Sequence, residues 1–201
     1  MRDRKKPHTE TKVSDNLQDI RIRNDHRTNW AATFQLSNAQ IAYVWHPSTA
    51  PDVSIQALRD GNYQPRQTIV WLKNRATLSR AAYHWKHEAC IYAVRVGENA
   101  NWLGDRKQHT VWEANSVEPK HRIHPTQKPI ELYLKPIEHH TEKKELVYDP
   151  FAGSGVVFSA CEELGRTAYG IDLEPHYCEK ILERFERETG KTPKLEGNIF
   201  N

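Results

Sequence analysis

The chain has 201 residues, of which 37% are hydrophobic and 27% are charged, and its formal net charge at pH 7 is +3. No apolar run approaches the roughly 20 residues of a membrane-spanning helix, and the polar start lacks the apolar core of a secretory signal. The three cysteines have no framework spacing, which argues against a disulfide scaffold and leads us to expect a cytoplasmic protein. The small basic excess permits a nucleic-acid partner without requiring one.

The first half of the chain predicts a polar arm and then strands. Residues 1–29 are charged and nearly free of apolar periodicity, so we expect an arm or loop ahead of a domain at 30–201. Short apolar runs rich in β-branched and aromatic residues predict strands at 40–45, 67–72 and 89–94. A helix at 52–60, ending at a glycine, makes the first two a β-α-β unit.

In the second half of the chain, predicted helices and strands alternate more regularly. Residues 98–123 carry no regular period and predict a long loop. After it we expect helices at 129–140, 155–164 and 175–188, with strands at 146–148 and 167–171 between them. Strands that alternate with helices are typical of an α/β fold with a mixed, mostly parallel sheet.

The string DPFAGSG at 149–155 follows an apolar strand and precedes a helix. Glycines let a backbone bend sharply and let a ligand approach closely, and a helix start offers unpaired N–H donors. Asp172 ends the next strand, where an acid of such a unit binds the two hydroxyls of a ribose. A dinucleotide fingerprint needs a third glycine where this chain has Phe158, so a ribose-bearing cofactor without phosphates fits better, with its ammonium group near Asp149.

Three strings in this order resemble the β-type DNA amino-methyltransferases: HPTQKP at 124–129, DPFAGSG at 149–155 and GIDLEPHY at 170–177. The resemblance covers about residues 30–190 and implies the Rossmann-like fold of methyltransferases that use S-adenosylmethionine. It also implies a double-stranded DNA substrate, as in restriction–modification systems. The methyl acceptor would be the exocyclic nitrogen of adenine or, as second choice, of cytosine.

The resemblance implies a target-facing half at 30–97 and a cofactor-binding half at 124–201. Four positions of the glycine turn would shape the cofactor pocket: Asp149, Phe151, Gly153 and Gly155. Asp172 would bind the ribose, with Glu174 as a less favoured substitute. Thr126 and Lys128 would lie near the methionine carboxylate, and a hydroxyl and an ammonium group are good partners for a carboxylate. The alternative for 126–129 is a loop whose proline begins a helix.

The catalytic motif of that family is absent from this sequence. It consists of Asp, Asn or Ser, then two prolines and an aromatic residue, and it binds the target amino group and stacks on the flipped base. The chain contains no Pro-Pro pair, so no catalytic residue is assigned. The family places this motif on a mid-sheet strand, between the strands at 40–45 and 146–148. We therefore expect a gap there, and a chain that needs an N-terminal segment or a partner.

Residues before the third strand are the DNA-facing candidates. Aromatic rings there would stack on bases and cations would meet phosphates; the candidates are Arg80, Tyr83, His84, Trp85 and Lys86. The alternative is a core aromatic residue among solvated charges. His84, His87 and Cys90 have a spacing seen in metal sites, but three ligands without a paired Cys-x-x-Cys do not predict one.

Two classes of function remain open. The first is an active DNA amino-methyltransferase. The second is a cofactor- and DNA-binding remnant that does not turn over without the missing motif. A methyltransferase for RNA or small molecules is a weaker third option.

Overall fold

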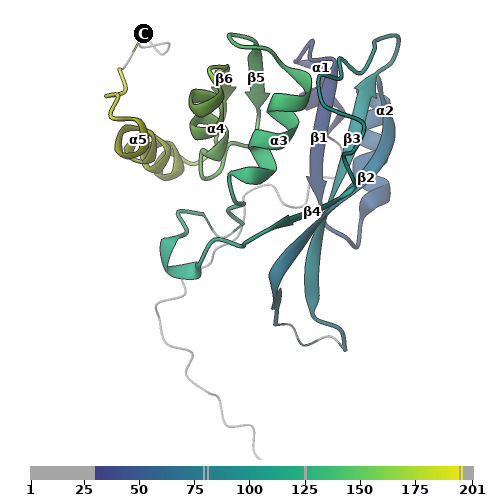
Figure 1. Ribbon diagram of the computed structural model, residues 1–201, viewed down its shortest axis with the longest axis horizontal. Coiled ribbons are helices and arrows are strands. Elements are labelled where there is room, and N and C mark those ends of the chain that lie inside the picture. The colour runs from purple at the N-terminus through teal and green to yellow at the C-terminus, as the bar shows by residue number, and fades with distance from the viewer. Residues whose placement is uncertain (1–29, 79, 81, 125, 195, 197–201) are drawn as a thin grey trace, which may run out of the picture.

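The computed structural model describes residues 30–78, 80, 82–124, 126–194 and 196, and it shows an α/β protein with two sheets (Figure 1). The arm predicted at 1–29 lies outside the described residues. The first helix, α1 (Ala31–Gln35), follows Trp30 without a side-chain cap.

The larger sheet is mixed. Its strands are β1 (Ile41–His46), β2 (Tyr63–Thr77), β3 (Trp85–Arg95) and β4 (Val111–Ala114), in the order β1-β3-β2-β4. Strand β3 is antiparallel to both β1 and β2, whereas β4 is parallel to β2. The predicted crossover through α2 (Pro51–Asp60) therefore joins two strands of one direction, but β3 lies between them.

Side chains along a strand alternate between the two faces of a sheet. Both faces of this sheet carry apolar side chains, and a helix covers each face. Leu58 of α2 packs with Ile91 and Ala93 of β3 on one face. Leu132 of α3 (Glu131–His140) packs with Trp71 and Cys90 on the other. These two clusters form the core of the first half of the chain.

The smaller sheet has two parallel strands, β5 (Leu146–Asp149) and β6 (Thr167–Gly170). Helix α4 (Val156–Leu164) connects them and packs on Ile137 of α3 through Val157 and Ala160. Helix α5 (Pro175–Thr189) follows β6. The glycines predicted to end α4 and α5, Gly165 and Gly190, are both left-handed C-caps.

The structure differs from the predictions in two respects. The strands β2 and β3 extend well beyond 67–72 and 89–94, because their polar ends pair with each other, up to Thr77 and Trp85. The segment predicted as one long loop contains β4 and a 3-10 helix, η1 (Pro119–His121). Only Trp112 of β4 is buried, so no apolar alternation marked that strand.

The predicted α/β fold with mixed strand directions is confirmed, and among the described residues β1 and β5 are end strands of separate sheets. In Figure 1, β5 is the strand of the smaller sheet on the side of β1. A missing strand was predicted at this junction, and each end strand has a neighbouring strand on one side only. Within the described part of the chain, the helices lack the length and apolar character required to cross a membrane.

Candidate cofactor site and DNA-facing ribbon

The glycine turn joins β5 to α4. Gly153 and Gly155 have φ values of 53° and 71°, a left-handed conformation that glycine adopts without strain. A Cβ atom on Gly155 would lie 2.8 Å from Cγ2 of Ile181, so α5 also packs directly against this position. The turn needs a glycine at 155 for both reasons, whereas at 153 only the backbone angle requires one.

Asp172 links the turn to the start of α5. Its Oδ2 atom accepts a hydrogen bond from the backbone N–H of Gly153 at 2.9 Å, and its Oδ1 atom accepts one from the N–H of Glu174 at 2.9 Å. Each carboxylate oxygen has a second lone pair. The carboxylate can therefore hold the turn in place and still accept hydrogen bonds from two hydroxyl groups.

Asp149 lies at the end of β5 and accepts a hydrogen bond from the backbone N–H of Phe151 at 3.0 Å. Burial raises the pKa of the Asp149 carboxyl, while that hydrogen bond and the charge of Lys128 oppose the rise. The Phe151 ring is 55% exposed and meets Trp30 edge-on, with ring centroids 5.1 Å apart. The turn thus presents an acid and an accessible aromatic ring together.

The segment before α3 reaches the turn through His124. A Cβ atom on Gly153 would lie 3.8 Å from Cγ of the His124 ring. The same ring packs on the ring of Tyr177 in α5, with the two ring centroids 4.6 Å apart. Thr126 is exposed and bonds to His124 Nδ1 through its hydroxyl at 3.0 Å. Burial lowers the pKa of His124, and Asp172 opposes that shift. Thr126 is therefore held beside the turn.

Lys128 points toward the larger sheet. Its Nζ atom lies 3.2 Å from Glu88 Oε2 of β3 and 5.1 Å from the centroid of the Trp45 ring. Its charge opposes the burial that raises the pKa of Asp149 and adds to the burial that lowers the pKa of His124, so it acts electrostatically on the turn. Lys128 connects the cofactor candidates with the larger sheet.

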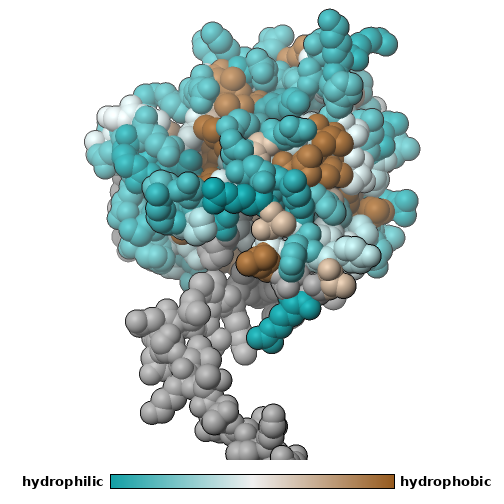
Figure 2. All heavy atoms as spheres, turned by 60° about the horizontal axis from the view of Figure 1, so that its bottom comes forward, coloured by the Kyte–Doolittle hydropathy of each residue, from teal (hydrophilic) through white to brown (hydrophobic). Residues whose placement is uncertain are grey.

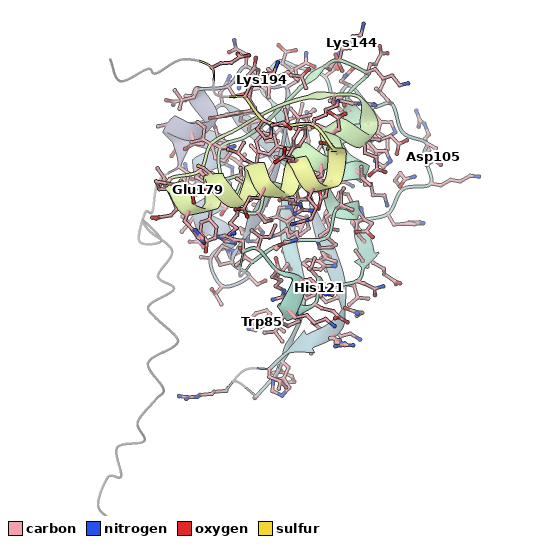
Figure 3. All side chains as sticks on the ribbon, turned by 90° about the vertical axis from the view of Figure 1, so that its left-hand side faces the viewer. Trp85, Asp105, His121, Lys144, Glu179 and Lys194 are labelled. Carbon is pink, nitrogen blue, oxygen red and sulfur yellow. The ribbon has the colours of Figure 1, made fainter. Side chains whose placement is uncertain are left out.

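The DNA-facing candidates gather at the far end of the ribbon that β2 and β3 form. Trp85 and Lys86 begin β3, Arg80 and His84 precede it, and the side chain of Tyr83 is 88% exposed. Figure 3 shows Trp85 at the end of the molecule opposite Lys144. The face that includes this end is largely hydrophilic, with a few hydrophobic patches (Figure 2). The ribbon therefore offers exposed rings and cations to a partner.

Among the described residues, no group of three or more His, Cys, Asp or Glu side chains is arranged so that it could hold a metal ion. Cys90, one of the three ligands considered, is fully buried in the core beside Trp71.

Sequence reasoning missed four residues at this site. His124 and Tyr177 lie within the recognised strings but were given no role, although they contact each other beside the turn. Glu88 and Lys73 complete an ion triad with Lys128. No local pattern signals the triad, because Glu88 and Lys128 are 40 positions apart in the sequence.

Comparison with known proteins decides the family. The family model described as DNA methylase, of the N6/N4 class, matches residues 37–183. This chain belongs to that DNA methylase family. The match contains the three recognised strings and all of β2 and β3, and it agrees with the resemblance read from the sequence.

Several relatives of this chain are named type II methyltransferases. M.HpaI of Haemophilus parainfluenzae is 38% identical over 81 residues, which is 39% of this chain and 26% of the relative. M.Cfr9I of Citrobacter freundii is 32% identical over 146 residues, 66% of this chain and 48% of the relative. The chain spans between about a quarter and about half the length of these relatives.

Solved structures support the same fold. The M1.HpyAVI–SAM complex has a TM-score of 0.67 at 23% identity and covers 77% of this chain and 80% of its own. The cytosine-N4-specific PvuII DNA methyltransferase has a TM-score of 0.55 at 13% identity, and the match covers 76% of this chain and 70% of that methyltransferase. At these identities the likeness shows only that this chain shares the fold of these methyltransferases.

Proposed function

We propose that this DNA methylase transfers a methyl group from S-adenosylmethionine to an exocyclic amino group in double-stranded DNA. The acceptor is N6 of adenine or, as second choice, N4 of cytosine. One observation carries the proposal: the Asp172 carboxylate, the glycine turn and the segment of Thr126 lie together at one end of the smaller sheet. Family membership and the SAM complex of a structural neighbour support it.

The residues at the turn fit this cofactor. Gly153 and Gly155 leave the backbone open to close approach, and Asp172 keeps lone pairs for two ribose hydroxyls. Asp149 offers an anion for an ammonium group, and Thr126 and Lys128 offer a hydroxyl and a cation for a carboxylate. The bound cofactor would supply the methyl group. The chain's own residues would bind it, orient it and exclude water from it.

The ribbon of β2 and β3 is the proposed DNA-binding element. Trp85 and Tyr83 provide rings that stack on bases, and Arg80 and Lys86 provide cations for phosphates. Transfer to an exocyclic amine depends mainly on aiming its lone pair at the methyl group, so positioning matters more than a general base.

A second candidate is a cofactor- and DNA-binding protein that needs a further segment for turnover. Two observations favour it. The sequence has no Pro-Pro pair, and β1 and β5 are end strands of separate sheets in the described structure. A strand that carries the family's catalytic motif would fit between them, supplied by the same polypeptide or by a partner.

Methyl transfer to DNA distinguishes the two candidates. Double-stranded DNA of mixed sequence is incubated with the protein and S-adenosylmethionine, digested to nucleosides and analysed by mass spectrometry. N6-methyladenine or N4-methylcytosine would establish the enzyme and its base. Binding of cofactor and DNA without a methylated nucleoside would favour the second candidate. Absence of cofactor binding would contradict both.

A further inference from the structure

Two lysines bind one carboxylate on the face of the larger sheet that α3 covers. Glu88 of β3 lies opposite Trp71 in the register, and Lys73 is two positions further along β2 on the same face. Lys73 Nζ lies 2.7 Å from Glu88 Oε1, and Lys128 Nζ lies 3.2 Å from Glu88 Oε2. We call these three residues the lysine–glutamate triad.

The triad is largely shielded from water. Both lysine side chains are 13% exposed, and the Glu88 side chain is 34% exposed. Lys73 and Lys128 also lie over the rings of Trp71 and Trp45, each 5.1 Å from the ring centroid. Burial alone would raise the pKa of Glu88, but the two lysines outweigh it and lower the pKa below its usual value. Glu88 is therefore a carboxylate near neutral pH.

The triad carries two positive charges and one negative charge, which leaves one positive charge in excess. Buried charges are costly unless they are paired, so an uncompensated cation favours a nearby anion. The segment that carries Lys128 lies beside the glycine turn, because the ring of His124, four positions earlier, would be 3.8 Å from a Cβ atom on Gly153. The charge of Lys128 also opposes the burial that raises the pKa of Asp149, and it adds to the lowering of the pKa of His124. An anionic group bound beside the turn would complete the pairing.

We infer that Lys73 is a positioning residue for cofactor binding: it neutralises Glu88, and the charge of Lys128 then remains available to the carboxylate of S-adenosylmethionine. This inference rests on the proposed function. Without Lys73, Glu88 would pair with Lys128 alone, the triad would have no net charge, and its attraction for a carboxylate would fall.

Variants in which glutamine replaces a charged side chain of the triad test the inference with two ligands. S-adenosylhomocysteine carries the amino-acid carboxylate, whereas methylthioadenosine has the same nucleoside and sulfur but no carboxylate. Affinities are measured by calorimetry for the wild type, Lys73→Gln, and Lys73→Gln combined with Glu88→Gln. Lys180→Gln with Glu183→Gln is the matched control, since that pair lies 2.7 Å apart on the exposed face of α5.

We expect Lys73→Gln to weaken S-adenosylhomocysteine binding roughly tenfold, the scale for the loss of one nearby charge in a partly shielded site. The double variant restores one excess positive charge, so its affinity returns to within about threefold of the wild type. Methylthioadenosine binds all four proteins alike, which also reports that the pocket is folded.

Three results would overturn the inference: an unchanged affinity in Lys73→Gln, a double variant as weak as the single one, or an equal loss for both ligands. A purely structural role for the triad predicts the second or the third. Wild-type protein that binds neither ligand would contradict the proposed function itself, and is thus distinguishable from failure of the inference.

Discussion

The Asp172 carboxylate accepts a hydrogen bond from the backbone N–H of Gly153 at 2.9 Å, across 19 positions of sequence. This bond joins the segment after β6 to the turn that follows β5, so the carboxyl ends of the two parallel strands lie close together. The same carboxylate accepts a hydrogen bond from the backbone N–H of Glu174, the residue just before α5, and so orients the start of that helix. The acid that we assign to the ribose is therefore also part of the frame of the pocket.

Gly155→Ala should destabilise the fold by about 2 to 4 kcal/mol, because it adds a left-handed backbone penalty and a steric clash. The new Cβ atom would meet Ile181 at 2.8 Å. Gly190→Ala is the control, since Gly190 has the same φ of 71° but a Cβ atom added there would have no neighbour within 4 Å, and it should cost only about 1 to 2 kcal/mol. Urea unfolding measures both values.

A second substitution separates the two contributions at Gly155. An Ile181→Ala background removes the two closest contacts, at 2.8 and 2.9 Å, and leaves only the Cβ atom of residue 181 at 3.2 Å, so the further cost of Gly155→Ala should fall toward that of Gly190→Ala. If the cost is the same in both backgrounds, α5 does not restrict this position.

His140 should make stability depend on pH. In the neutral ring, the Nδ1–H group donates a hydrogen bond to the Ala100 carbonyl at 2.7 Å, and Nε2 accepts one from the Tyr43 hydroxyl at 2.8 Å. Burial lowers the pKa of His140. Because the folded state favours the neutral ring, stability is fully present above the unfolded pKa of about 6.5 and declines as the pH falls below it.

The matched variant for that effect is His140→Phe, which keeps a ring to stack on Tyr92. It should lose about 1 to 3 kcal/mol at pH 7.5 through the unsatisfied hydroxyl and carbonyl groups. It should also lose less stability than the wild type between pH 7.5 and pH 5.5. An identical pH dependence in the two proteins would show that His140 does not titrate on unfolding.

The ribbon candidates should affect DNA affinity and leave cofactor affinity unchanged. Arg80→Gln and Lys86→Gln should each weaken binding across all sequences and reduce the slope of log affinity against log salt by about 1. Lys144→Gln is the control, because Lys144 lies at the opposite end of the molecule (Figure 3). Fluorescence anisotropy at several salt concentrations measures the slopes. An unchanged slope in both ribbon variants would remove the ribbon from the DNA interface.

The sequence predicted the elements whose stability is local. The strand ending at Asp149, the helix stopped by Gly165 and the acid after β6 all follow from apolar periodicity and glycine placement. It did not predict the pairing of Thr77 with Trp85, because those strand ends are polar and are stabilised by each other.

The long-range contacts of the candidate site could not be predicted from the sequence either. The position of Asp172 was predicted, but not its bond to Gly153, and the salt bridge of Glu88 with Lys128 depends on β3 and the segment before α3 meeting in space. Periodicity concerns neighbours within a helix or strand, whereas these contacts are set by how the elements pack.

Titration of S-adenosylmethionine into this protein and into Asp172→Ala tests whether the glycine turn is the cofactor site. We predict saturable one-site binding to the wild type, and an affinity loss of about 1.5 to 3 kcal/mol in the variant, the scale for hydrogen bonds to a charged group. Glu174→Gln should bind nearly as the wild type. Absence of wild-type binding, or an unchanged affinity in Asp172→Ala, would contradict the assignment of this turn as the cofactor site.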